Sequence, residues 1–121
     1  MVNNEGSESR EDRVEFTTRT EKSAKEGPEG IFRTTLAYNE QSMMCHFVMK
    51  KGAKIPIHHH PAVQNGYVIK GKVKFFRGEK YSFTVEPGGS YVFDPEEPHG
   101  AEVLEDAELI ECFAPMRPEY V

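Results

Sequence analysis

Short segments rich in Val, Ile, Phe, Tyr and Thr make up most of the sequence, and Gly, Pro or Asn interrupts them at close intervals. A period of two is clearest over residues 81–86, where apolar and polar side chains alternate. No stretch of ten or more residues has a clear helical period of 3.6. Turn signals occur at YNE, KKG, IKG, RGE and EPGG. Roughly nine short strands with regular turns predict an all-β protein, and a jelly-roll β-barrel limits its exposed sheet edges.

The length of 121 residues suits one domain with one core. Residues 1–13 are polar and poor in large apolar side chains, so we expect a flexible N-terminal arm. The predicted β-barrel domain then covers residues 14–121. Residues 21–30 are polar and contain Gly and Pro, which predicts a loop or a single helical turn.

Charge and hydropathy exclude several classes of partner. The formal net charge is −5 and the basic residues are scattered, so we expect no nucleic-acid partner. No apolar run is long enough to cross a bilayer, so we expect no membrane association. The N-terminus lacks the pattern of a secretory signal, which predicts a cytoplasmic protein. Cys45 and Cys112 lie in apolar runs and are expected to be reduced thiols.

The segment IPIHHHP contains consecutive histidines. His58 and His60 are two residues apart on a predicted strand, so both side chains point to one face and can share a metal ion. His59 points to the opposite face with Ile55 and Ile57, and that apolar outer face fits a contact between two copies of the chain. Histidines beside a proline turn can also be half-exposed polar residues without a ligand.

Two further residues favour a metal site over that alternative. Gln64 lies a short turn beyond His60 and carries an amide oxygen that can coordinate an ion. His99 follows Pro98 in a second turn. Neutral imidazoles suit Zn, Ni, Cu, Fe and Co, so the histidines alone do not select the metal.

These residues resemble the two sequence motifs of the cupin superfamily. The first motif, G-x5-H-x-H-x3-[E/Q]-x6-G, is matched by Gly52, His58, His60, Gln64 and Gly71. The second is similar to EPGGSYVFDPEEPH, which ends on His99. The resemblance implies a double-stranded β-helix, the conical barrel that the strand pattern also predicts. It further implies one divalent transition metal ion (Zn, Ni, Fe or Mn) held by His58, His60, Gln64 and His99.

Gln64 departs from the usual pattern, because most metal-binding cupins have Glu at this position. With a neutral amide and neutral imidazoles, a divalent ion keeps its full charge and is a stronger Lewis acid. This favours polar isomerisation or hydration over dioxygen chemistry. The alternative is that Gln64 does not coordinate the ion at all.

The C-terminal segment AELIECFAPMRPEYV contains two candidate catalytic residues. Alternation groups Glu111 with Leu109 and Phe113 on an apolar face, where desolvation would raise its pKa toward the range of a general acid or base. An edge strand with this face in water is the alternative. Arg117, between two prolines, can be aimed at a carboxylate by a rigid loop, or it is a surface arginine. For His46 the pattern does not choose between the barrel mouth and a neighbouring sheet.

The segment GIFRTTLAYNEQSMM, the HxHPxxQ pattern with GYVIKG, and the chain's ending resemble the small KdgF-type cupins. Those proteins act in pectin and alginate breakdown, where they convert unsaturated monouronates from the ring form to a linear keto form. The family ending D-x-F-x-P-x-R-x-x-Y aligns with Glu111, Phe113, Pro115, Arg117 and Tyr120. The resemblance implies that Glu111 and Arg117 are the catalytic pair, with Glu111 one methylene longer than the usual Asp.

The leading hypothesis is therefore a metal-dependent isomerase or lyase-like enzyme acting on a small sugar acid. Its substrate is a small-molecule carboxylate that pairs with Arg117, while Glu111 moves a proton. A mononuclear iron dioxygenase and a non-catalytic metal- or ligand-binding module are the alternatives. A homodimer is expected from the outer face at Ile55 and Ile57 and from the habit of cupins.

Overall fold

The computed structural model describes residues 13–121, and in that range it contains β-strands and two short 3₁₀ helices but no α-helix. Along the chain the elements are η2 (Arg19–Glu21), β1 (Lys25–Glu26), β2 (Ile31–Tyr38), β3 (Met43–Met49), β4 (Lys54–His58), β5 (Val63–Arg77), β6 (Tyr81–Val85), β7 (Ser90–Phe93), β8 (His99–Ala114) and η3 (Pro118–Tyr120). The expected arm over residues 1–13 lies outside the described residues, apart from Arg13. Within the described range, no helix is long and apolar enough to cross a membrane.

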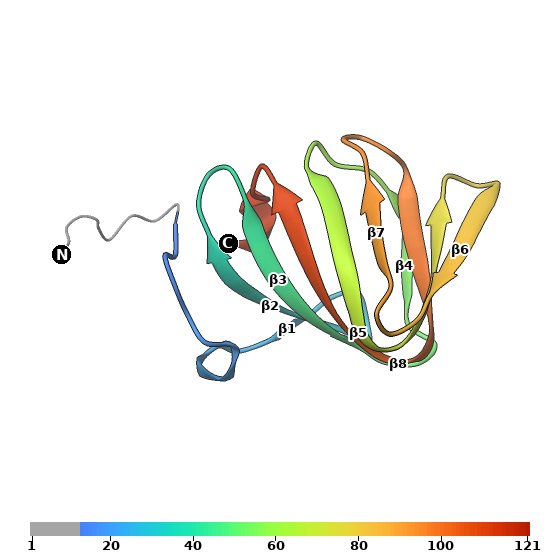
Figure 1. The fold of residues 1–121 in the computed structure, drawn as a ribbon, viewed down its shortest axis with the longest axis horizontal. Coiled ribbons are helices and arrows are strands. Elements are labelled where there is room, and N and C mark those ends of the chain that lie inside the picture. Colours follow the sequence, from blue (N-terminus) through green and yellow to red (C-terminus); the bar gives the residue numbers. More distant parts are fainter. Residues whose placement is uncertain (1–12) are drawn as a thin grey trace.

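The strands form one antiparallel sheet that curls around a common interior (Figure 1). The long strands β5 and β8 pair with each other along most of their length and take part in both halves of the curl. In one half, β7 pairs with the beginning of β5, and β3, β2 and β1 follow beyond the end of β8. In the other half, β6 pairs with the end of β5, and β4 pairs with the beginning of β8. This is the β-barrel predicted from the strand pattern, in the form of the double-stranded β-helix that the resemblance implied.

One predicted turn is wrong. The segment IKG, residues 69–71, lies within β5, where Gly71 has a φ of +89°. The pairing between β5 and β8 shifts register three times between Val68 and Val73, so both strands bend there without ending. A bulge around a glycine gives the same sequence signal as a turn, so β5 joins two segments that were expected to be separate strands, and β8 joins two more. The expectation of a loop or a single helical turn over residues 21–30 is also incomplete, because β1 lies there, and the described residues therefore form eight strands where roughly nine were expected.

The expected outer face at Ile55 and Ile57 is also wrong. Ile55 packs against the core, whereas Ile57 is 44% exposed. The register of β4 against β8 shifts between Ile55 and His58, and Pro56, which has no N–H to donate, lies within this shift. Because the strand is irregular here, two residues of equal parity do not share a face.

Burial confirms the expected core and locates the polar residues within it. The apolar interior is built from inward-facing side chains of both halves, including Met49, Val68, Phe93, Leu109 and Phe113. Cys45 belongs to this core and Cys112 is partly buried, and both are free thiols as expected. Four buried polar side chains gather in the same interior: His60, Gln64, His99 and Glu111.

Gly71→Ala tests the bend in β5. A Cβ at this position would lie 2.2 Å from the backbone oxygen of Asp106, and the positive φ adds strain. Gly78→Ala is the matched control, since Gly78 has a φ of +69° but open space around it. We expect the control to lower the free energy of unfolding by about 1–2 kcal/mol, and Gly71→Ala by roughly 1–3 kcal/mol more. Urea unfolding measures both, and equal losses would contradict the bend.

Candidate metal centre

Three histidines from two separate parts of the chain converge. His58, the last residue of β4, pairs in register with His99, the first residue of β8. His60 lies in the turn after β4, beyond the strand that was expected to carry it. One ring nitrogen from each histidine lies within 4.8 Å of the others. The structure thus brings together His58 and His60, the pair predicted from its spacing, and His99, which ends the second motif.

Each imidazole is oriented by a backbone carbonyl two residues away. The distances from Nδ1 to the carbonyl oxygen are 2.9 Å for His58 to Pro56, 2.9 Å for His60 to Ala62 and 2.7 Å for His99 to Glu97. Because a carbonyl oxygen can only accept, Nδ1 carries the proton in each ring and Nε2 keeps its lone pair. Such contacts are a common way to orient a histidine that ligates a metal through its other nitrogen.

Gln64, on β5, brings an oxygen to the same point. Its Oε1 lies 3.0 Å from Nε2 of His60 and 3.1 Å from Nε2 of His99. With Nδ1 protonated in both rings, the two Nε2 atoms and Oε1 all carry lone pairs. They face one another, and none of them has a proton to donate. A cation between them removes that conflict, and a set of imidazole nitrogens with one amide oxygen suits a divalent transition metal. The residues therefore fit the ion that the sequence implied.

Electrostatics also favour the ligand form of the histidines. Burial lowers the pKa of His99 from its ordinary value of 6.5 to about 4. Burial likewise lowers the pKa of His60, and the nearby Arg117 guanidinium lowers it further. Both rings are therefore neutral at pH 7, which is the state that binds a metal.

The two remaining histidines lie outside this cluster. His59 is exposed, as its predicted outward direction implied, and its Nδ1 lies 2.7 Å from Oε1 of Glu96. His46, for which the sequence left two positions open, is buried, with Nε2 2.6 Å from Oε2 of Glu108 on the neighbouring strand β8. Neither side chain lines the pocket beside the three converging histidines.

Glu111 lies in the interior next to Gln64 and is only 4% exposed. Its strand, β8, is flanked here by β3 and β5, so the alternative of a wet edge strand is wrong. Oε2 of Glu111 accepts hydrogen bonds from Gln64 Nε2 at 2.9 Å and from the Tyr91 hydroxyl at 2.5 Å. Burial raises the pKa of Glu111, and the two hydrogen bonds offset part of that rise.

This contact gives a physical reason for an amide at position 64. The NH₂ group of Gln64 donates to the carboxylate of Glu111, so its oxygen is turned toward His60 and His99. A carboxylate at position 64 would instead face a second carboxylate at hydrogen-bond distance inside the protein, where two like charges are costly. The amide thus connects the histidine cluster to Glu111 and avoids a second buried carboxylate beside it.

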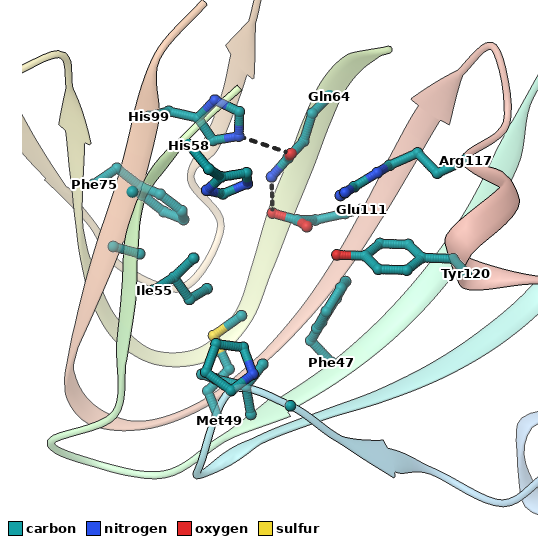
Figure 2. Close-up of a pocket in the computed structure, with 15 residues that line it drawn as sticks. Phe47, Met49, Ile55, His58, Gln64, Phe75, His99, Glu111, Arg117 and Tyr120 are labelled. Carbon is teal, nitrogen blue, oxygen red and sulfur yellow. Dashed lines mark hydrogen bonds between the residues drawn. The ribbon is translucent and has the colours of Figure 1, made fainter. Parts of the chain in front are cut away.

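Arg117 lines the same pocket from the C-terminal segment (Figure 2). Its side chain is 12% exposed, and Nη2 donates to Oε2 of Glu119 at 3.0 Å. Its guanidinium carbon lies 4.2 Å from the centre of the Tyr120 ring. The Nε atom is buried without a hydrogen-bond partner among the described residues. A buried N–H without an acceptor is costly, so this atom favours a ligand that supplies one.

The far side of the pocket is apolar. Figure 2 shows His58, Gln64 and His99 on one side and Phe47 and Met49 below them. The arrangement confines polar contacts to one region of a small-molecule site, which fixes how a ligand can be oriented.

Sequence reasoning missed Tyr91. Alternation along β7 places it inward, but no local pattern shows that its hydroxyl reaches Glu111 on another strand. The contact depends on Gly66, which is the register partner of both Tyr91 and Glu111. Neither the short strand β7 nor the glycine within β5 offers a signal for such a contact before the pairing of the strands is known.

The chain belongs to the cupin family, because the family model for the cupin domain matches residues 45–113. Its fold is similar to an RmlC-like cupin from Shewanella frigidimarina, with 25% identity, a TM-score of 0.84, and coverage of 91% of this chain and 99% of that one. It is also similar to KdgF from a Halomonas species, with 28% identity, a TM-score of 0.80, and coverage of 88% and 99%. A Klebsiella pneumoniae protein with a double-stranded β-helix domain is 20% identical, with a TM-score of 0.69 and coverage of 84% and 90%. The comparison with curated proteins gave no match.

A charge swap tests the link between Gln64 and Glu111. We expect Gln64→Glu to lower the free energy of unfolding of the chelator-treated protein by about 1–3 kcal/mol, because a buried donor is lost and a second carboxylate is introduced. The double variant Gln64→Glu/Glu111→Gln restores an amide facing a carboxylate and should recover most of that loss. Urea unfolding at pH 7 gives the comparison, with Glu111→Gln alone as the control. An equal loss in the single and double variants would refute the link.

Proposed function

We propose that this cupin is a metal-dependent enzyme that isomerises a small sugar acid, by opening an unsaturated uronate to its linear keto form. The observation that carries the proposal is the grouping of a three-histidine cluster, a buried carboxylate and an arginine with an unpartnered buried N–H around one pocket. The similarity to KdgF from Halomonas supports this choice of substrate class, because the sequence resembles the KdgF-type cupins at its motifs and its ending.

His58, His60, His99 and Gln64 are the residues that would hold the ion. When bound, a divalent ion supplies Lewis acidity toward a substrate oxygen. The neutral ligand set leaves the full charge of the ion available for this purpose.

Arg117 binds the carboxylate of the substrate. Its unpartnered Nε and the planar guanidinium can donate parallel hydrogen bonds to the two carboxylate oxygens. The ring of Tyr120 lies against the guanidinium and limits its movement. The substrate is therefore anchored by its charged end next to Glu111.

Glu111 moves the proton. Opening the ring removes a proton from the anomeric hydroxyl as the ring carbon–oxygen bond breaks, and a proton must then reach the carbon that becomes the methylene next to the ketone. The reaction is an isomerisation, so one carboxylate can accept the first proton and supply the second without net change. A carboxyl group with a raised pKa suits both roles near neutral pH.

Turnover tests the proposal directly. Protein stripped of metal and reloaded with Zn, Ni, Mn or Fe is mixed with an unsaturated monouronate, and loss of the double-bond absorbance is followed. We expect at least one metal form to exceed the spontaneous rate. Glu111→Gln should lower kcat about 10²–10⁴-fold while metal content is kept, and the exposed ion-pair residue Glu105 supplies the control Glu105→Gln.

Two outcomes of this assay would count against the proposal. No metal form exceeding the spontaneous rate would reject the substrate. A ligand-induced rise in melting temperature without turnover would instead assign a binding module.

We propose further that two copies of the chain associate through the outer face of the half of the barrel that contains β3 and β7. Exposed apolar side chains project outward from three of its strands: Met44 and Val48 on β3, Tyr67 and Ile69 on β5, and Val92 on β7. The pairing registers place Met44 and Val92 in one row across the sheet. An isologous contact sets this patch against itself and removes it from water.

Tyr67→Glu tests the association, because Tyr67 is 51% exposed at the middle of this face. We expect the variant to be a monomer by light scattering coupled to size-exclusion chromatography, since a carboxylate would be buried in the contact. Ile57→Glu, at an exposed residue on β4, should leave a dimer. A monomeric unsubstituted protein would reject the proposal.

A further inference from the structure

Tyr91 is a buried polar side chain that the proposed reaction does not use. It is 7% exposed, it does not line the pocket, and its hydroxyl donates a 2.5 Å hydrogen bond to Oε2 of Glu111. Burial raises the pKa of Tyr91 well above its ordinary value, so it remains a donor at neutral pH.

The contact is possible because residue 66 has no side chain. Gly66 on β5 is the register partner of Tyr91 on β7 and of Glu111 on β8, so it lies between them. A Cβ there would come within 2.3 Å of the Tyr91 hydroxyl oxygen and 2.9 Å of Cγ of Glu111. The tyrosine ring therefore passes over the glycine to reach the carboxylate on the strand beyond it.

The hydrogen bonds continue from Glu111 to the histidine cluster. Oε2 of Glu111 accepts hydrogen bonds from both Tyr91 and Gln64, so two donors fix the orientation of the carboxylate. Neither of these hydrogen bonds is made to Oε1. The same contact sets the orientation of the Gln64 amide, whose oxygen then faces His60 and His99. A change at Tyr91 can thus alter the position of an atom in the metal centre that Tyr91 does not touch.

We propose that Tyr91 is a positioning residue for the metal centre, acting through Glu111 on the orientation of Gln64 across the gap left by Gly66. This rests on the metal centre of the proposed function but not on its substrate. It assigns the buried hydroxyl a role in ion binding, whereas a merely structural role would confine its effect to stability.

Cobalt binding tests the proposal without any substrate. Chelator-treated protein is titrated with Co²⁺, and its dissociation constant and visible ligand-field bands are recorded. Tyr91→Phe removes only the hydroxyl, since the ring keeps its contacts with Phe75 at 4.2 Å and Phe93 at 5.9 Å. We expect the variant to bind Co²⁺ about 10-fold more weakly, with shifted bands. Tyr81→Phe, at an exposed tyrosine on β6 outside the site and the proposed contact between copies, should match the unsubstituted protein.

A double-variant cycle identifies the route of the effect. In the background Glu111→Ala, Tyr91→Phe should cause no further loss of Co²⁺ affinity, because its only route to Gln64 has been removed. The proposal is overturned if Tyr91→Phe matches Tyr81→Phe, if it lowers only the melting temperature, or if it weakens cobalt binding equally in both backgrounds.

A second variant keeps the test valid if Tyr91→Phe does not fold. Fluorotyrosine then replaces Tyr91, because fluorine makes the phenol hydroxyl a stronger hydrogen-bond donor and leaves the hydroxyl in place. The cobalt bands should then shift in the presence of Glu111 and not in Glu111→Ala, and an absence of that difference overturns the proposal. An unsubstituted protein that binds no cobalt would reject the metal centre itself, whereas normal cobalt results without uronate turnover would reject only the substrate.

Discussion

The antiparallel pairing of β5 with β8 is the constraint on which the rest of the structure depends (Figure 1). It sets Gly66 opposite Glu111, which places the neighbouring Gln64 within hydrogen-bond distance of that carboxylate. At its other end, β8 starts with His99, which pairs with His58 on β4. Because both long strands cross from one half of the barrel to the other, the pairings along β8 align the candidate metal ligands with the acid behind them. A slip of one residue would turn each of these side chains to the outer face.

The candidate site keeps its buried carboxylate apart from the histidine cluster. The imidazoles of His60 and His99 are neutral because burial disfavours their charged forms, and the ligand offered by β5 is an amide. The buried carboxylate of Glu111 lies behind the amide and does not join the histidine cluster. An ion in this cluster would therefore retain its full charge, while Glu111 keeps a raised pKa.

The C-terminal segment completes the pocket. After β8 ends at Ala114, the chain turns so that Arg117 and Tyr120 lie against the pocket, and the backbone oxygen of Tyr120 accepts a 2.6 Å hydrogen bond from Thr35 on β2. In the proposed function, the barrel thus supplies the ion-binding and proton-moving groups, and the tail supplies the cation for a carboxylate. This division lets a change in the tail alter substrate preference while the ion-binding residues stay in place.

The local sequence determined the class of fold and most residues of the candidate site. Alternation and turn residues act over a few positions, so they predicted an all-β barrel and indicated His58, His60 and Glu111. The resemblance to the cupin motifs then implied that Gln64 and His99 join the two histidines. Tertiary structure alone decided the course of the chain at Ile55 and Gly71, where bulges break the alternation that a strand pattern assumes. It also decided the contact of Tyr91 with Glu111, because that bond joins strands paired on either side of a glycine. Such contacts depend on register between distant segments, and register is fixed only when the whole barrel closes.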